Sequence, residues 1–241
     1  PITEYDTFYQ DWLEDAIIGA KDHIWPGRIK YFALSSGTTG APSKRIPVTT
    51  EMIRSFQRVS LRQFSVLHEL NLSDNFYGSK VLAVGGSTKL KKVGNHFEGD
   101  LSGILKKHTS LIAAPFAKPN KKITHLKDWK AKLPLMVEQA PKWNIGIMAG
   151  IPSWCVLLLE EIVNHYQLKN IHEIWPNFKV YVHGGVYMDP FKERLKKVCG
   201  EPVILLDTYL ASEGYFGYQI SPKRKGMKLL LNNSIFFELI P

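Results

Sequence analysis

The amino-acid sequence contains no long hydrophobic run. Its most apolar stretches, residues 156–159 and 235–240, are far shorter than the roughly 18 to 20 residues that a membrane-spanning helix needs. Hydrophobic residues make up 44% of the 241-residue chain and charged residues 22%, which is typical of an ordinary globular protein. We therefore expect a folded protein, long enough for one large α/β domain, and no membrane partner.

Cysteine is scarce, and the spacings that hold a structural metal are missing. Cys155 and Cys199 are too few for a disulfide framework, and neither has a partner at C-x-x-C spacing. The eight histidines form no H-x-x-x-H pair. We expect a reducing, cytoplasmic location and no zinc or iron site.

A leader peptide is also missing from the sequence. No basic-then-apolar segment follows Pro1. The final residues, 234–241, read as a strand with little after it. The ending favours a fragment of a longer protein; no signal peptide is visible, with a leader already removed by processing as the alternative.

Acidic residues are outnumbered by basic ones. The chain has 31 Lys and Arg against 22 Asp and Glu, a formal net charge of +9, and lysines cluster at residues 89–92, 118–122 and 223–228. Such clusters are typical of nucleic-acid-binding modules. Here proline, glycine and asparagine interrupt them as in solvated loops, and aromatic residues do not alternate with the lysines. We expect no nucleic-acid partner and keep a basic nucleic-acid-binding module as the alternative from another functional class.

Short apolar runs alternate with longer amphipathic ones along the chain. We expect strands at residues 30–34, 80–84, 110–114, 144–148, 179–183, 203–207, 229–231 and 235–240. We expect helices at residues 2–20, 128–139 with a break or kink at Pro134, 154–166 with Ser153 as N-cap, and 191–198 after Asp189-Pro190. Another helix follows Thr49 or Thr50 as N-cap, with one face made of Ile53, Phe56, Ser60, Phe64 and Leu67. This alternation implies an α/β fold of mixed, largely parallel sheets covered by helices.

Three loops of small residues follow predicted strands, at the edge where parallel-sheet enzymes keep their chemistry. The first, residues 35–44, reads Ser-Ser-Gly-Thr-Thr-Gly-Ala-Pro-Ser-Lys. Its N–H groups and hydroxyls can face an anion without bulky side chains, and Lys44 adds a positive charge for phosphate. It is not a Walker loop, because Ser43 precedes the lysine. A flexible linker is the alternative, but it would seldom lie between a buried strand and a long helix.

The other two loops are residues 184–186 and 208–214. The segment from Asp207 to Gly214 places the Glu213 carboxylate just after a strand, and oxygen ligands of this kind suit Mg²⁺. Judged from the residues alone, a helix that begins with Ser212 as its N-cap is the alternative. A Gly-Gly pair after a strand is, by itself, a turn.

The order of these residues resembles the signatures of the adenylate-forming superfamily of acyl-CoA ligases, luciferases and peptide-synthetase adenylation domains. In those enzymes the first loop handles the β- and γ-phosphates of ATP, and the Gly-Gly segment lines the adenine and acyl pockets. The resemblance implies that Tyr209 packs on adenine, Ser212 contacts the α-phosphate and Glu213 binds Mg²⁺. It makes Lys44 and Glu213 the predicted catalytic residues and ATP and Mg²⁺ the predicted cofactors. The implied nucleotide-binding residues are Ser35, Ser36, Gly37, Thr38, Thr39, Gly40, Lys44, Gly184, Gly185, Val186, Asp207, Tyr209, Ser212 and Glu213.

Further details resemble the plant auxin-responsive acyl-acid amido synthetase family and its bacterial relatives. They are the segment Lys-Arg-Ile-Pro-Val-Thr at 44–49, the Tyr-x-Ala-Ser-Glu-Gly form of the later motif, the Phe-Glu-Leu-Ile-Pro ending and the opening Pro-Ile-Thr-Glu-Tyr-Asp. The resemblance implies that residues 1–241 belong to the large N-terminal domain that binds ATP and the acyl acid. That family's Tyr-Arg-x-Gly-Asp element and its small C-terminal domain would lie beyond Pro241.

The implied reaction is adenylation of a carboxylic acid with release of pyrophosphate, followed by amide formation with an amine, in particular an amino acid. A CoA ligase or acyl-protein synthetase with a thiol acceptor is the alternative within the same chemistry. A nucleotide-binding but inactive relative is a further one.

The pocket for the acid leaves the weakest pattern. Gly85, Gly86 and Trp154 follow strands on the same predicted edge, so they are candidates to line it. A tryptophan at a helix start is more often part of a core. His183, beside the Gly-Gly pair, is a candidate general base, with a structural role as the alternative.

Overall fold

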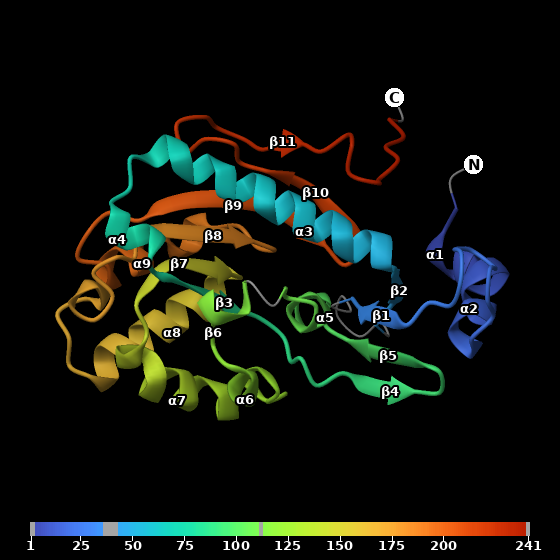
Figure 1. Ribbon diagram of the computed structural model, residues 1–241, viewed down its shortest axis with the longest axis horizontal. Helices are drawn as coiled ribbons and strands as arrows, with labels where there is room; N and C mark the ends of the chain where they lie inside the picture. Colours follow the sequence, from blue (N-terminus) through green and yellow to red (C-terminus); the bar gives the residue numbers. More distant parts are fainter. Residues whose placement is uncertain (1–2, 36–42, 111–112, 240–241) are drawn as a thin grey trace.

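The computed structural model describes residues 3–35, 43–110 and 113–239. Figure 1 shows a large twisted sheet with helices on both faces and a smaller sheet beside it, next to the N-terminal helices. The expected fold class, an α/β protein with mixed, largely parallel sheets covered by helices, is confirmed. Within the described residues, no helix is both long enough and apolar enough to cross a membrane.

The larger sheet has the strand order β11-β10-β9-β8-β7-β3-β6. Its central strands are parallel to one another, so their carboxyl ends meet at one edge. Strand β10 runs antiparallel to β9, and β11 antiparallel to β10. The strands are β3 (Lys80–Val84), β6 (Ala117–Lys118), β7 (Ile145–Gly150), β8 (Val180–Gly184), β9 (Ile204–Ala211), β10 (Gly214–Tyr218) and β11 (Lys228–Leu229).

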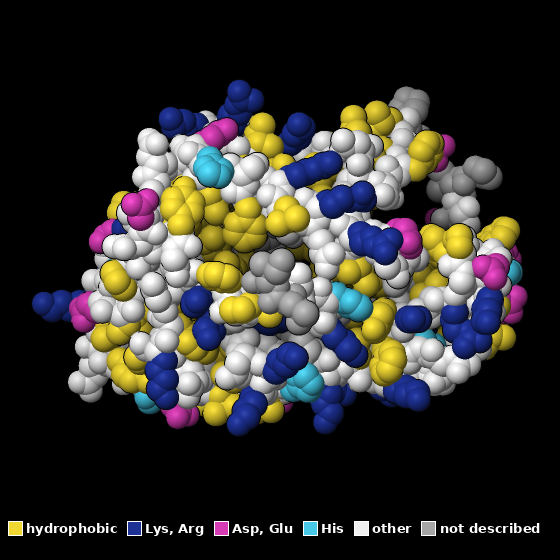
Figure 2. Space-filling model, in the orientation of Figure 1, with side chains coloured by type: hydrophobic (Ala, Val, Ile, Leu, Met, Phe, Trp, Pro, Cys, Tyr) yellow, Lys and Arg dark blue, Asp and Glu magenta, His cyan; other side chains and the backbone are white. Residues whose placement is uncertain are grey.

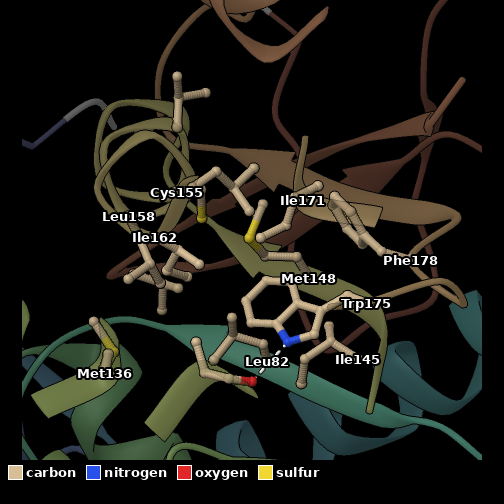
Figure 3. Close-up of a cluster of buried hydrophobic side chains, with 14 of the residues drawn as sticks. Leu82, Met136, Ile145, Met148, Cys155, Leu158, Ile162, Ile171, Trp175 and Phe178 are labelled. Atoms are coloured by element: carbon tan, nitrogen blue, oxygen red, sulfur yellow. Dashed lines mark hydrogen bonds between the residues drawn. The ribbon is translucent and has the colours of Figure 1, made fainter. Parts of the chain in front are cut away.

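Both faces of the central strands are covered, which explains their continuous apolar sequences. Helices α7 (Trp129–Gln139), α8 (Pro152–His165) and α9 (Lys192–Val198) pack on one face, and α3 (Thr50–Ser65) packs on the other. Figure 3 shows the first cluster, where Trp175 and Phe178 lie beside Met148 and the Trp175 Nε1–H donates to the carbonyl of Ala140 at 2.9 Å. Each fully buried apolar side chain contributes about 1.5 to 3 kcal/mol, so the strands are held in fixed positions.

Helix α3 is amphipathic as expected, but its buried stripe differs from the prediction. The Thr49 hydroxyl accepts a hydrogen bond from the Met52 amide at 3.1 Å and caps the helix. The buried residues of the helix are Ile53, Ser55, Phe56, Val59 and Gln63, whereas the predicted positions Ser60 and Phe64 face solvent. Ile53, Phe56 and Leu67 of the predicted face are buried as expected.

The smaller sheet has the order β2-β1-β5-β4. Its strands are β1 (Tyr31–Leu34), β2 (Arg45–Val48), β4 (Lys91–Val93) and β5 (His96–Gly99), and the last two form a hairpin that the sequence did not predict. The lysines of β4 are exposed, so the strand resembles a solvated loop in sequence. Helix α5 (Leu101–Lys107) follows this sheet. The N-terminal helices α1 (Tyr5–Phe8) and α2 (Glu14–Ile18) lie beside it, and Ala16 of α2 packs on Ile29 and Phe32.

Several helix starts differ from the prediction. Helix α8 begins with Pro152 at its first position and Ile151 as N-cap, so Ser153 is not the cap. Helix α9 begins at Lys192, after a 3₁₀ turn over Asp189–Phe191. Helix α7 accommodates Pro134 in its interior without ending there.

Two predicted strands are wrong. Residues 235–239 are not in a strand, and Ala114 opens a short 3₁₀ turn, with residues 111–112 outside the described part of the chain. Residues 235–239 are poorly enclosed by neighbouring strands, since Phe236 and Leu239 are almost fully exposed. Helix α4 (Asp74–Tyr77) is a single turn before β3. Helix α6 (Lys121–Thr124) is a single turn between β6 and α7.

Candidate active site

The carboxyl ends of β8 and β9 approach each other so closely that only glycine fits between them. A Cβ atom on Gly184 would lie 2.4 Å from the carbonyl oxygen and 2.5 Å from the Oγ1 of Thr208. The Thr208 hydroxyl donates to the carbonyl of His183 at 2.8 Å and ties the two strand ends together. Gly185 has a φ of +83°, a conformation that costs other residues roughly 1 to 2 kcal/mol. Backbone packing at this edge therefore requires the Gly-Gly pair, and Val186 after it is exposed.

Ser212 and Glu213 form a tight turn between β9 and β10. Ala211 pairs with Gly214 directly across this turn. The structure thus corrects the expected loop at 208–214, and the alternative helix beginning at Ser212 is wrong. β9 continues through Thr208 and Tyr209 because β-branched and aromatic residues fit a pleated strand. The turn leaves the Glu213 side chain exposed.

Asp207 and Tyr209 share one face of β9, because alternate residues of a strand point the same way. Tyr209 is 56% exposed, with its ring centroid 5.0 Å from that of Phe216. Asp207 is the direct parallel partner of His183 on β8, with its Oδ1 3.5 Å from the His183 Nδ1.

The two ends of the small-residue loop are bound to each other. The Ser35 amide donates to the Lys44 carbonyl at 3.0 Å, and the Lys44 amide donates to the Ser35 hydroxyl at 3.1 Å. The loop therefore starts and ends at one point, between β1 and β2. The predicted phosphate contacts at Ser36, Gly37, Thr38, Thr39 and Gly40 lie outside the described residues.

A cavity of about 640 Å³ has both Lys44 and Glu213 in its wall. This volume lies in the range of small-molecule sites, roughly 300 to 1,000 Å³. Residues more than 160 positions apart in the chain thus face one space, as expected if one ligand contacts both. Other residues of the wall, which the sequence analysis did not connect with the site, include Tyr5, Thr49, Glu51, Ser55, Phe56, Tyr215 and Asn233.

Tyr5 contacts both Lys44 and Arg45. Its hydroxyl accepts from the Arg45 amide at 2.9 Å and donates to the Arg45 carbonyl at 3.2 Å. The Lys44 Nζ lies 4.6 Å from the centroid of the Tyr5 ring, a cation–π distance. In the sequence, Tyr5 is only one aromatic residue among several at helical spacing, so nothing marks it as part of the site.

The floor of the cavity is a buried chain of polar side chains. The Ser55 hydroxyl donates to the Asn233 Oδ1 at 2.6 Å, and the Asn233 Nδ2 donates to the Tyr215 carbonyl at 2.9 Å. The Tyr215 hydroxyl donates to the Gln63 Oε1 at 2.8 Å. These bonds join α3, β10 and the segment around residue 233, which are far apart in sequence.

A buried carboxylate on β5 ties β2 to the other strands of the smaller sheet. Glu98 is 5% exposed, and its Oε1 accepts from the Arg45 Nε at 2.6 Å and from the His96 Nε2 at 3.1 Å. Burial alone would raise the pKa of Glu98, but the hydrogen bonds from Arg45 and His96 outweigh it and hold the pKa below its ordinary value. The residue next to Lys44 is therefore fixed by an ionised carboxylate.

The predicted acyl-pocket residues lie along the same edge as the Gly-Gly pair. Gly85 and Gly86 follow β3, and the Gly85 carbonyl accepts from the Lys132 Nζ at 3.0 Å. Trp154, in the first turn of α8 after β7, is 40% exposed and its ring centroid lies 4.3 Å from that of Trp129. Trp154 is thus not a core residue.

The positive charges do not gather in one patch on the face shown in Figure 2, where lysine and arginine side chains are spread over the surface. Across the described parts of the chain, no group of three or more His, Cys, Asp or Glu side chains is placed to enclose a metal ion. The cavity wall does hold two carboxylates, those of Glu51 and Glu213.

The architecture is that of the adenylate-forming enzymes. The chain superposes on a structure of GH3.15 acyl acid amido synthetase with a TM-score of 0.69 at 16% identity, covering 93% of this chain and 48% of that one. A complex of the AtGH3.15 synthetase with 2,4-DB gives a TM-score of 0.68 at 18% identity, with the same coverages of 93% and 48%. A 2-hydroxyisobutyryl-CoA ligase structure with 2-HIB-AMP and CoA gives 0.58 at 12% identity, covering 94% of this chain and 47% of that one.

The family follows from the sequence itself. The family model described as the GH3 family N-terminal domain matches residues 1–133 and 73–204, so the chain belongs to the GH3 family. The resemblance to the acyl-acid amido synthetases is thereby confirmed. The chain spans about half the length of the solved structures it matches. No curated protein sequence matches it.

Proposed function

We propose that this protein uses ATP to convert a carboxylic acid into an acyl-adenylate, and that residues 1–241 are part of the domain that binds ATP and the acid. The observation that carries the proposal is that Lys44, at the end of the phosphate-type loop, and Glu213, in the β9–β10 turn, line one cavity. Membership of the GH3 family and the fold shared with acyl acid amido synthetases support it.

In the proposed reaction, the substrate carboxylate attacks the α-phosphorus of ATP. The bond between the α-phosphorus and the oxygen that bridges it to the β-phosphate breaks, and pyrophosphate leaves. Negative charge increases on the departing pyrophosphate, so catalysis depends on placement and neutralisation. Lys44 supplies a positive charge whose direction is set by the Tyr5 ring. Tyr209 offers an exposed ring to adenine, and the Gly184-Gly185 backbone allows close approach of the nucleotide.

The carboxylates of the cavity wall suit a magnesium ion whose other ligands are phosphate oxygens and water. Mg²⁺ in nucleotide sites is commonly bound by one or two carboxylates and keeps water and phosphate oxygens as its other ligands. Glu213 is exposed in the turn and Glu51 lies in the same cavity wall. When bound, the ion would neutralise phosphate charge. We assign Glu213 as its first protein ligand.

For the second half of the reaction we propose transfer of the acyl group to an amine, in particular that of an amino acid. Membership of the GH3 family, whose fold is shared with solved acyl acid amido synthetases, supports an amide over a thioester. Two free cysteines among the described residues agree with a reducing, cytoplasmic setting.

The test is ATP–pyrophosphate exchange by the intact protein with a panel of carboxylic acids. We expect exchange that depends on an acid and on Mg²⁺. Glu213→Gln should reduce it on the order of 100-fold without unfolding the protein, because a preorganised charge at the reacting phosphates is lost. Acid-dependent exchange that is unchanged in Glu213→Gln would contradict the assignment of Glu213.

Lys44 has a matched control within the chain. Lys107 also lies over an aromatic ring, with its Nζ 4.9 Å from the Phe97 ring centroid, but it is not part of the cavity wall. Lys44→Ala should raise the KM for ATP and slow exchange, whereas Lys107→Ala should leave both near wild type. Products formed with CoA and with amino acids as competing acceptors then separate thioester from amide formation.

A further inference from the structure

Three histidines of the described chain are buried, and they differ in how their ring nitrogens are satisfied. His96, His172 and His183 are 3%, 8% and 6% exposed. His172 is bonded at both nitrogens, to the Phe178 carbonyl at 2.8 Å and from the Gly200 amide at 3.2 Å. The Nδ1 of His183, in contrast, is enclosed and has no hydrogen-bond partner among the described residues. A buried polar atom without a partner costs about 1 to 3 kcal/mol, so its retention calls for a reason.

Asp207 is the acidic group nearest to that nitrogen. Its Oδ1 lies 3.5 Å from the His183 Nδ1, and the parallel register of β8 and β9 places the two residues directly opposite each other. The distance is slightly too long for a hydrogen bond and short enough for one to form when the ring gains a proton. In many enzymes a carboxylate orients a histidine through one ring nitrogen, and the other ring nitrogen removes the proton.

The surroundings keep the ring neutral at rest. Burial lowers the pKa of His183, Asp207 acts in the opposite direction, and Lys192 of α9 lowers the pKa further. Lys192 is itself paired with Asp189 at 2.5 Å. On β8, the Tyr181 ring centroid lies 5.7 Å from that of His183. A neutral imidazole is the form that can accept a proton.

The position of this pair coincides with the predicted nucleotide edge. His183 directly precedes the Gly184-Gly185 turn, and its carbonyl accepts from the Thr208 hydroxyl. Asp207 shares its face of β9 with the exposed ring of Tyr209. A nucleotide stacked on Tyr209 would therefore have the His183–Asp207 pair as a neighbour on the same face of the sheet.

We propose that His183 is the general base of the acyl-transfer half-reaction, with Asp207 as its positioning residue; this rests on the proposed function above. The neutral primary amine of the acceptor attacks the acyl carbonyl carbon, and a C–N bond forms. One N–H proton passes to the His183 Nε2. The bond between the acyl carbon and the phosphate oxygen breaks, and AMP leaves with that electron pair.

The two half-reactions differ in their need for a base. In adenylation the nucleophile is a carboxylate, which is already ionised at neutral pH and gives up no proton. In amide formation the attacking nitrogen must lose a proton for the amide to form. Loss of His183 should therefore affect transfer more strongly than pyrophosphate exchange.

The experiment uses the intact protein with an acid found active in exchange. Exchange and amide formation from that acid and an amino acid are measured for wild type, His183→Gln and the control His172→Gln, with circular dichroism to check folding. We expect His183→Gln to lose amide formation by about 100-fold or more, the usual contribution of a positioned base, and to lose much less exchange. Folded His172→Gln should retain the wild-type ratio of the two rates.

The pH dependence of amide formation gives a second, independent readout. The rate should rise with pH as His183 loses its proton. Asp207→Asn removes a group that raises the His183 pKa, so the rise should move to lower pH, while Lys192→Met should move it to higher pH. A structural role would produce neither shift.

The outcomes separate this inference from the proposed function. Wild type without acid-dependent exchange would overturn the proposed function and the inference with it. If wild type shows acid-dependent exchange, two results would overturn the base assignment alone. One is that His183→Gln changes exchange and amide formation by the same factor. The other is that the pH profile of amide formation is the same in Asp207→Asn, Lys192→Met and wild type.

Discussion

Removal of the buried Glu98 carboxylate should both destabilise the protein and loosen the candidate phosphate site. Glu98 joins β5 to β2 through Arg45, the residue after Lys44, and to α2 through His96, whose Nδ1 lies 3.1 Å from the Ile17 carbonyl. Glu98→Ala would leave both partners without their acceptor. Glu98→Gln keeps the shape and one acceptor oxygen but removes the charge.

The magnitude follows from burial. Removal of one member of a fully buried ion pair costs about 3 to 5 kcal/mol. The Glu98 side chain is 5% exposed but that of Arg45 is 37% exposed, so water compensates part of the loss. We expect about 2 to 3 kcal/mol for Glu98→Ala and about 1 to 2 kcal/mol for Glu98→Gln. For a chain of this size the alanine variant should melt about 4 to 12 °C lower.

The pH dependence gives the sign of the effect. Because the pKa of Glu98 in the folded protein lies below its ordinary value of 4.5, its charge stabilises the fold above that pH. The stabilisation is lost as the pH falls through the lower, folded-state pKa. The difference in unfolding free energy between wild type and Glu98→Gln should thus be constant near neutral pH and shrink in acid.

Urea unfolding monitored by tryptophan fluorescence between pH 3.5 and 7.5 measures this difference, and ATP titrations at neutral pH measure the effect on the site. Arg54→Ala serves as the control, since Arg54 forms only an exposed pair with Glu51 at 3.8 Å. If Glu98→Gln were as stable as wild type at pH 7, or if the difference grew on acidification, the buried pair would not hold β2 as described.

Three further substitutions test how the fold holds the site. Gly184→Ala would place a methyl group 2.4 Å from the Thr208 carbonyl, so we expect a loss of about 1 to 3 kcal/mol in urea unfolding and weaker ATP binding in titrations. Asn233→Ala removes the side-chain partner of Ser55 and the donor to the Tyr215 carbonyl, while the Ser55 hydroxyl keeps the Asn233 main-chain carbonyl at 3.2 Å; it should cost about 1 to 2 kcal/mol, visible as a lower melting temperature. Thr49→Ala removes the cap of α3 and should cost about 1 kcal/mol, whereas Thr49→Ser should restore most of it.

The central strands could be predicted because both of their faces are buried. β3 has the expected bounds, and β7 and β8 begin one residue later than expected. A short, mostly apolar run that ends at glycine is typical of a buried strand in a globular chain. The cap of α3 at Thr49 was predictable for a local reason, since the hydroxyl acts on an amide three residues away.

The β9–β10 hairpin could not be predicted from its turn. Two-residue hairpin turns are usually marked by Asn-Gly or Asp-Gly, whereas here the residues are Ser212 and Glu213. A serine followed by glutamate and glycine also suits a helix start, and only pairing with β9 decides for a strand. The opposite error was made at residues 235–239, where a strand was predicted and none is present. The segment is hydrophobic but has no neighbouring strand to pair with in the described part of the chain.

The sequence by itself determined the residue types at the site: the small-residue loop, Lys44, the Gly-Gly pair, Tyr209 and Glu213 form recognisable local patterns. Only the tertiary structure decided that Lys44 and Glu213 face one cavity, that Tyr5 lies under Lys44, and that Asp207 stands opposite His183. Local patterns are fixed by backbone conformation within a few residues. Contacts between distant segments depend on strand order and register, which are set by how the whole core packs.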